Sequence, residues 1–273
     1  MNALTDPNHH QEGAVCGLRK PVVDDLLALS RLHGCELDWS SITTLQRRCY
    51  DDVLELQLRG EPALAALAMV RSGLPLAPTA LLAYTLNRLK ADYANIYLTH
   101  GTHGSPCESV WLDEDSLNPP ASTLGVPGWY RAHGLPEEDW RRHREDHLVN
   151  QLRFLAHLVG AKTASAPLAD AVRFMDEHPL RWVSRFAQRV AVCCDTRFYA
   201  GLALLTAAYL DELRDLLGNF LGLPRTHRTH PVGRGGGRAN PDPERGRDPL
   251  TYPLADHMCR GARASSAVAL RPS

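Results

Sequence analysis

Residues 196–217, TRFYAGLALLTAAYLDELRDLL, decide the fold class of this chain. Apolar side chains recur at steps of three and four, which places them on one face of an α-helix: Phe198, Leu202, Leu205, Tyr209, Leu213 and Leu216. Thr196 is a residue type that caps helix starts, and Gly218, Gly222 and Pro224 mark the end. The stretch therefore predicts a long amphipathic helix whose apolar face other elements must cover.

The same periodicity extends outward along most of the chain. It predicts further helices over 139–160, 178–194, 78–97, 21–33, 41–58 and 62–70. Alternation with period two and β-branched residues, which is typical of strands, is absent. We therefore expect an all-α protein with one globular helical domain.

Composition divides the chain into three parts. We expect a flexible N-terminus over 1–16, the helical domain over 17–223 and a disordered tail over 224–273, which is rich in Arg, Gly and Pro. One long irregular stretch inside the domain, from His100 to about Pro127, is of the kind that more often carries function than not.

Charge and cysteine content restrict the function classes. The net charge is −1, but residues 221–273 hold nine arginines against four acids, so the remainder carries about −6. Such an acidic domain is a poor candidate for non-specific nucleic-acid binding. Seven cysteines without a CxxC pair favour reduced thiols in a cytoplasmic protein. No secretory signal and no apolar run near 18 residues is visible, so we expect no membrane span.

No catalytic set assembles from the motifs, and two alternatives stay open. His143 and His147 stand four apart, which on a helix suits a divalent metal, so a metal-dependent helical enzyme is one alternative. Arg144 stands where an HExxH site needs its general base, so a solvated helix start is the favoured interpretation. An RNA-binding adaptor that acts through the Arg-rich tail is the other alternative.

Three segments together resemble the TorD/DmsD family of redox-enzyme maturation chaperones. Residues 105–112 (SPCESVWL) are similar to its Pro-Tyr-Glu-Ser-Val-Tyr-Leu segment, with a cysteine in place of the tyrosine. Residues 145–158 (EDHLVNQLRFLAHL) resemble its Pro-Asp-His-Leu signature and the Glu-Leu-Glu-Phe-Leu helix after it, with Glu for Pro and with Gln and Arg for the two acids. Residues 178–182 (HPLRW) and 196–199 (TRFY) match its late pattern.

The resemblance implies an all-helical chaperone rather than an enzyme, without a cofactor or metal of its own. Such proteins bind the catalytic subunit of a molybdenum enzyme of the dimethyl sulfoxide reductase family and hold it in the cytoplasm until the molybdopterin is inserted. Many also bind its twin-arginine signal peptide. The variant at 107–111 is similar to chaperones of type II enzymes, such as dimethyl sulfide or selenate oxidoreductases. A monomer or a domain-swapped dimer is compatible with a helical chain of this kind.

The matching positions define the expected client-binding and signal-peptide-binding residues: Glu108, Trp111, Asp146, His147 and Phe154. A signal peptide offers two arginines followed by an apolar stretch, which an acidic domain attracts and a groove between helices buries. Core packing is the alternative for the aromatic residues, including Trp129 and Tyr130, and a helix cap is the alternative for Asp146.

Overall fold

The computed structural model describes residues 7–48, 54–74, 79–99, 101, 104–112, 125–135, 143–161 and 166–225. Within these ranges, side chains are not described for 7–16, 47–48 and 79–82. The predicted tail beyond Arg225 lies outside the described residues, as do residues 1–6 of the predicted N-terminal segment.

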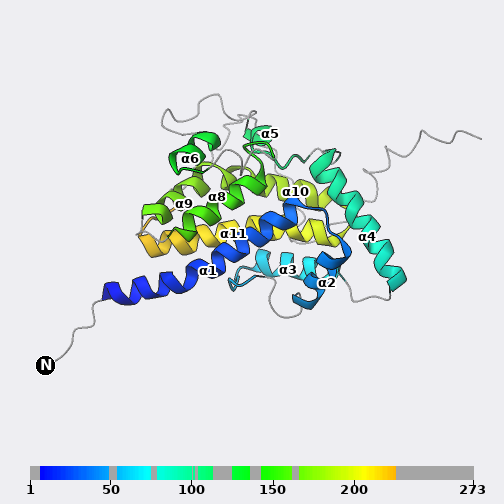
Figure 1. Ribbon diagram of the computed structural model, residues 1–273, viewed down its shortest axis with the longest axis horizontal. Helices are drawn as coiled ribbons and strands as arrows, with labels where there is room; N and C mark the ends of the chain where they lie inside the picture. Colours follow the sequence, from blue (N-terminus) through cyan, green and yellow to red (C-terminus); the bar gives the residue numbers. More distant parts are fainter. Residues whose placement is uncertain are drawn as a thin grey trace, which may run out of the picture. The chain divides into compact units, whose positions relative to one another are not determined.

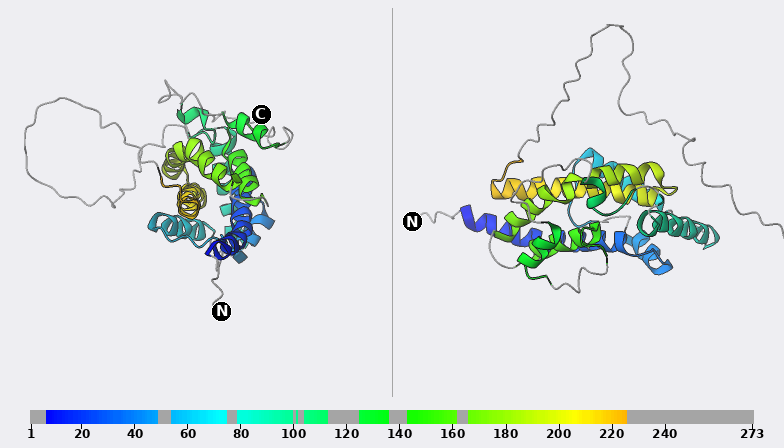
Figure 2. Two further views of the ribbon diagram at one scale, coloured as in Figure 1. Left: turned by 90° about the vertical axis from the view of Figure 1, so that its left-hand side faces the viewer. Right: turned by 90° about the horizontal axis from the view of Figure 1, so that it is seen from above.

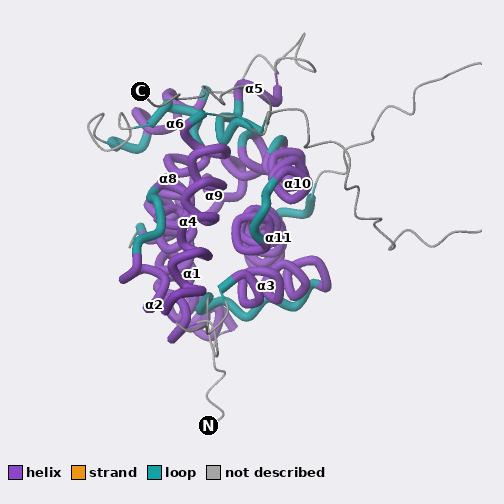
Figure 3. Tube along the Cα trace, turned by 90° about the vertical axis from the view of Figure 1, so that its right-hand side faces the viewer, coloured by secondary structure: helices purple, strands orange, loops and turns teal. Residues whose placement is uncertain are grey.

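A bundle of helices surrounds one central helix, α11 (Arg197–Leu221) (Figure 1). Viewed end-on, α11 lies between α3 (Glu61–Gly73) on one side and α10 (Val183–Cys193) on the other (Figure 3). It also contacts α9 (Ala166–Glu177) and α4 (Thr79–Tyr93), while α1 (Pro7–Gly34) packs along α8 (Leu148–Gly160). The predicted long helix over 196–217 is therefore confirmed as the centre of the core.

Shorter elements complete the fold. These are α2 (Trp39–Arg48), a π-helical turn (Ala94–Leu98), α5 (Ser109–Leu112), α6 (Val126–Ala132) and a 3₁₀ turn (Pro179–Arg181). Across the described ranges the only extended pairing is an isolated bridge between Cys107 and His147. The all-α prediction is confirmed for these residues. α4 and the N-terminal turns of α1 lie at opposite ends of the bundle (Figure 2).

A carboxylate from α4 fixes the start of α11, whereas a glycine directly after the helix fixes its end. Asp92 fixes the start, because its carboxylate accepts the backbone N–H groups of Asp195 (3.1 Å) and Thr196 (2.8 Å). Thr196 occupies the predicted cap position, but its hydroxyl donates to Asp92 (2.6 Å) rather than capping the helix. At the other end, Gly222 adopts φ 66°, a left-handed conformation that glycine allows without strain.

α3 and α11 approach each other closely at Gly201. A Cβ on Gly201 would stand 2.7 Å from the backbone nitrogen of Val70 and 3.0 Å from the backbone oxygen of Ala66. Both atoms belong to the rigid backbone of α3, so only glycine fits this crossing.

Three helix boundaries differ most from the sequence predictions. α1 begins at Pro7, inside the segment expected to be flexible, and it continues through Pro21, where a start was expected. A proline inside a helix removes one backbone hydrogen bond, and the packing of α1 along α8 offsets this loss. α8 begins at Leu148, well after the predicted start at 139, because residues 143–147 form turns that dock elsewhere. α2 ends at Arg48, and 54–60 is irregular.

Two carboxylates tie that irregular segment to the bundle. Asp25 of α1 accepts the N–H groups of Glu55 (2.7 Å) and Leu56 (2.9 Å), and Glu212 of α11 accepts that of Gly60 (2.8 Å). Among the helices that the structure describes, none has the length and apolarity to cross a membrane.

Candidate functional site

Two of the three signature segments are joined through their backbones. The N–H of Leu148 donates to the carbonyl of Pro106 (2.8 Å), and the N–H of Glu108 donates to the carbonyl of Asp146 (3.1 Å). These bonds flank the bridge between Cys107 and His147. The pairing explains why 143–147 is not helical: its backbone groups pair with residues 106–108 instead of continuing α8 toward its N-terminus.

Glu108 lies at the centre of a buried polar network that links all three signature segments. Its carboxylate, 7% exposed as a residue, accepts a bond from Nε2 of Gln151 (2.6 Å) and lies 2.9 Å from Nδ1 of His178. Gln151 in turn accepts the indole N–H of Trp182 (3.3 Å). We call Glu108, Gln151, His178 and Trp182 the Glu108 network. Buried polar groups stabilise a fold when they are bonded to one another in this way.

Asp146 caps a neighbouring segment rather than its own helix. Its Oδ2 accepts the N–H of Ser109 (2.8 Å) at the start of α5, and its Oδ1 faces Nε of Arg144 (3.3 Å). Partial burial acts to raise the pKa of Asp146, but the bonds from Ser109 and the charge of Arg144 outweigh it and hold the pKa below its usual value. Asp146 is therefore an ionised carboxylate, already engaged by its own chain.

The cap of α8 is His147. Its Nδ1 accepts the N–H of Val149 (3.1 Å), and its side chain is almost buried, at 6% exposure. The ring of His143 stacks on it with centroids 4.7 Å apart. Burial, with the charge of Arg153 as a second cause, lowers the pKa of His143. Within the described ranges, no group of three or more His, Cys, Asp or Glu side chains is arranged to hold a metal ion.

Trp111 lies at the outer edge of the site and is hydrogen-bonded on both sides. Its indole N–H donates to the carbonyl of Ser105 (2.7 Å), and its own carbonyl accepts a bond from Arg185 of α10 (2.7 Å). The side chain is partly exposed, and its neighbour Val110 is exposed. Cys107, by contrast, is buried, and burial raises the pKa of its thiol, which makes it a structural rather than a reactive cysteine.

Phe154 does not reach the surface. Its side chain is 0% exposed and packs against the rings of Phe174 (4.7 Å) and Tyr130 (5.0 Å). Tyr130 and Trp129 are buried in the same cluster. Phe154 is therefore packed in the core in this structure, which is the alternative considered for the aromatic residues, and its expected role in client binding stays a prediction.

The structure thus brings Glu108, Trp111, Asp146 and His147 together. Two of these residues are buried, and the other two are partly exposed. Glu108 and His147 are buried and bonded internally in this structure, and their expected role in client binding stays a prediction. Sequence reasoning missed the roles of Gln151, His178 and Trp182. Their signal was present, since all three stand in the signature segments, but only three-dimensional proximity shows what they bond.

Known proteins with similar sequences support the family resemblance. A family model described as nitrate reductase delta subunit matches residues 63–188. A "Chaperone protein TorD" from Vibrio cholerae serotype O1, El Tor Inaba strain, is 31% identical over 134 residues, which cover 45% of this chain and 60% of that protein. A "Chaperone protein TorD" from the Classical Ogawa strain is 30% identical over 142 residues, which cover 49% and 64%. The chain thus spans less than two thirds of the length of these relatives.

Proposed function

We propose that this chain, which is similar to the TorD/DmsD family of redox-enzyme maturation chaperones, binds the catalytic subunit of a molybdopterin enzyme of the dimethyl sulfoxide reductase family. It holds that subunit in the cytoplasm until the cofactor is inserted, and it also binds the twin-arginine signal peptide. It performs no turnover of its own. This family consists of chaperones rather than enzymes, as the signature segments led us to expect.

The Glu108 network is the observation that carries the proposal. The polar side chains of the network form hydrogen bonds with one another inside the protein. We therefore infer that the signature segments form a rigid support for a binding surface and not a set of reactive side chains. A binding surface that is held rigid loses less conformational entropy when a partner docks.

The exposed and partly exposed residues of the signature segments near the Glu108 network are both apolar and charged, as in many protein interfaces. Val110 is exposed, Trp111 and Asp146 are partly exposed, and Arg144 and Glu145 are exposed. We call these five residues the signature surface. An aliphatic and an aromatic side chain surrounded by charges of both signs suit recognition of a partly folded protein subunit. The signature surface is therefore the proposed contact for the catalytic subunit.

Affinity capture tests this function. The tagged full chain is expressed in its native host, and the captured proteins are identified by mass spectrometry. We expect enrichment of a molybdoenzyme catalytic subunit, and we expect Val110→Asp to reduce its recovery strongly because the substitution puts a charge in place of the exposed aliphatic side chain of the signature surface. Leu64→Asp, at an exposed leucine of α3, is the matched control. Repeated capture of other proteins without any molybdoenzyme subunit would overturn the proposal.

A further inference from the structure

The short helix α5 carries the apolar part of the signature surface, but apolar packing holds it only weakly. It has four residues, and none of them is fully buried. Trp111 and Leu112 are partly buried against the core. A single helical turn is not stable on its own in water, because its nucleation costs more than its few hydrogen bonds return. Other contacts must therefore keep α5, and with it Val110 and Trp111, in place.

The start of α5 is held by the segment that precedes α8. Asp146 accepts the N–H of Ser109 (2.8 Å), and the guanidinium of Arg144 donates to the hydroxyl oxygen of Ser109 (3.1 Å). The N–H of Glu108, one residue earlier, donates to the carbonyl of Asp146 (3.1 Å). The first N–H groups of a helix need partners from outside it, and a carboxylate suits them in charge. The start of α5 is therefore well fixed.

The end of α5 is held by a side chain of α10. Arg185 donates through Nη2 to the carbonyl of Trp111 (2.7 Å). The last carbonyl groups of a helix lack partners within it and carry partial negative charge, so a cationic donor suits them. Hydrogen bonds from a charged donor are also stronger than those between neutral groups. Arg185 therefore links the end of α5 directly to the helical bundle.

α10 presents Arg185 from a rigid position. Just before α10 begins, Trp182 donates its indole N–H to Gln151 of the Glu108 network (3.3 Å). Phe186 and Val190 of α10 are fully buried, whereas Arg185 is exposed. α5 lies next to α10 at the edge of the bundle (Figure 1). The same helix thus joins the buried network at its start and supports the signature surface one turn later.

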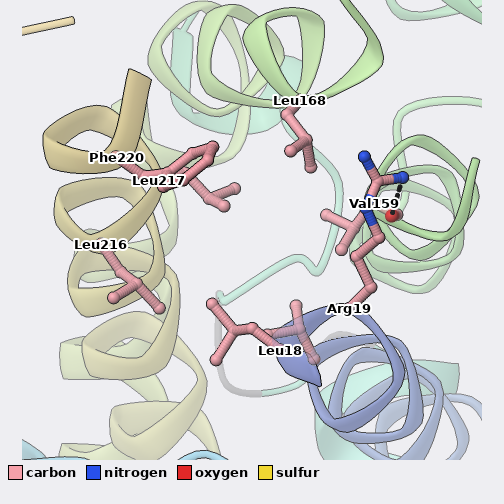
Figure 4. Close-up of a pocket in the computed structure, with 8 residues that line it drawn as sticks. Leu18, Arg19, Val159, Leu168, Leu216, Leu217 and Phe220 are labelled. Carbon is pink, nitrogen blue, oxygen red and sulfur yellow. Dashed lines mark hydrogen bonds between the residues drawn. The ribbon is translucent and has the colours of Figure 1, made fainter. Parts of the chain in front are cut away.

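The largely apolar cavity between α1, α8, α9 and α11 offers no comparable set of polar contacts. It has a volume of about 250 Å³ and is bounded by residues such as Leu18, Leu168 and Phe220 (Figure 4). Among its described lining residues, the charged one is Arg19, whose guanidinium donates to the carbonyl of Val159 (3.4 Å). Nothing in this lining selects a ligand or a partner, whereas the contacts of α5 fix a defined surface.

We propose that Arg185 is a positioning residue for client binding. Through its bond to the carbonyl of Trp111 it holds α5 in the orientation in which Val110 and Trp111 meet the catalytic subunit. Without this bond α5 keeps its start but loses the support of its end, so more conformational freedom must be lost when the client docks. This inference rests on the proposed function, and it adds to the signature surface a residue that lies outside it.

A matched pair of variants isolates the bond. Arg185→Met removes the donors but keeps an unbranched side chain that favours the helix. Arg189→Met is the control, because Arg189 lies one turn later on the exposed face of α10 and shares in none of the described bonds to α5. Each variant removes one positive charge. Since both arginines are exposed, both variants should unfold at the same urea concentration as the unmodified chain.

Hydrogen exchange reports on α5 without any client. In the unmodified chain, the N–H groups of Ser109 and Trp111 are both hydrogen-bonded. Arg185→Met should speed deuterium uptake of a peptide that contains residues 109–112 about fivefold, the effect that loss of one hydrogen bond has on a local opening equilibrium. Arg189→Met should leave it unchanged, and the peptides of α11 should exchange at the same rate in all three chains.

Capture of the catalytic subunit from the native host reports on the client. Arg185→Met should lower its recovery by about a factor of two or more, because affinity falls with the fraction of molecules in which α5 is ordered. Recovery is measured by mass spectrometry against isotope-labelled reference peptides. Arg189→Met should recover as much of the subunit as the unmodified chain does.

The outcomes separate this inference from the proposed function. Faster exchange at 109–112 together with lower recovery, both confined to Arg185→Met, supports it. Unchanged exchange there, unchanged recovery despite faster exchange, equal effects of both variants, or a lower urea midpoint in Arg185→Met each overturn it. If the unmodified chain captures no molybdoenzyme subunit, the proposed function fails and the role of Arg185 in client binding fails with it, whereas the exchange rates still show whether Arg185 holds α5.

Discussion

Glu108 shows how one buried side chain can link separate segments of the candidate site. Its carboxylate bonds both His178 and Gln151, and these residues come from different signature segments. Glu108→Ala takes this partner from two buried polar side chains, so we expect unfolding to require about 3 kcal/mol less free energy. Urea denaturation followed by circular dichroism measures the change.

The nearby Glu145→Ala provides the comparison for this loss. The side chain of Glu145 is exposed, while its backbone carbonyl, which the substitution retains, accepts the hydroxyl of Tyr130 (3.1 Å). The substitution should change the unfolding free energy by less than about 0.5 kcal/mol. Equal effects of the two substitutions would show that the Glu108 network does not hold the segments together.

His33 makes the stability of the fold depend on pH. It is fully buried, with Nδ1 2.6 Å from the hydroxyl of Tyr97 and Nε2 2.8 Å from that of Thr206. The Thr206 hydroxyl donates its proton to the carbonyl of Leu202 (2.8 Å), so Nε2 must carry the hydrogen and Nδ1 must accept from Tyr97. Burial lowers the pKa of His33 to about 3, so this imidazole is neutral in the folded protein.

Below the usual histidine pKa, the unfolded chain therefore binds a proton at His33 that the folded chain does not. Stability should fall as pH decreases from about 6.5 toward 3, by up to about 1.4 kcal/mol per pH unit. The lowered pKa of His143 adds to this loss, whereas the raised pKa of Asp25, caused by burial, opposes it at the acid end. His33→Gln should flatten the pH dependence of the urea midpoint between pH 7 and 5; an equally steep profile in this variant would assign it to other groups.

Among the elements, α11 could be predicted almost completely from sequence, and α8 only in part. Helical periodicity and Gly222 are local features, so they locate α11 to within a few residues. The start of α8 depends on Pro106 and Glu108, which pair with residues about 40 positions away, and no local pattern contains that pairing. For the same reason Glu108 was recognised as important from sequence, but not as buried.

Replacing glycine by alanine should change the unfolding free energy in opposite directions at two positions, the first of which lies at the α3–α11 crossing. Gly201→Ala should lower the unfolding free energy by about 1–3 kcal/mol, because its Cβ would collide with the backbone of α3. The same substitution at Gly17 should raise it by about 1 kcal/mol, because Gly17 is an exposed helical residue of α1 where an added methyl group meets no described atom within 4 Å. Thermal unfolding of the two variants measures both effects. Stabilisation by Gly201→Ala would show that the helices can separate without cost.

At the scale of the whole molecule, hydrogen bonds from polar side chains to residues distant in sequence fix where several helices and segments lie. Asp92 caps α11 from α4, Glu212 holds the start of α3, and Asp25 holds the segment before it. The apolar periodicity of the sequence predicts helices but not these links, because a carboxylate's partner is set by the packed fold. For the same reason, the sequence could not show that Glu108 and Asp146 have hydrogen-bond partners within their own chain.

The end of the folded part can be located by truncation. Arg225 pairs with Asp211 and Asp215 (2.6 Å each), and the guanidinium of Arg214 donates to the carbonyls of Leu223 (2.9 Å) and Pro224 (3.4 Å). A chain that ends at Arg225 keeps all these contacts and the left-handed cap at Gly222. It should therefore unfold at the same urea concentration as the full chain.

A chain that ends at Leu221 loses the cap and leaves the nearly buried Arg214 with only Asp176 among these partners. We expect it to be destabilised by about 1–3 kcal/mol, because a buried guanidinium then lacks hydrogen-bond acceptors. Equal stability of both truncated chains would place the boundary before the expected one at 223/224. A large loss in the chain that ends at Arg225 would instead show that residues 226–273 contribute to folding, contrary to the prediction of a disordered tail.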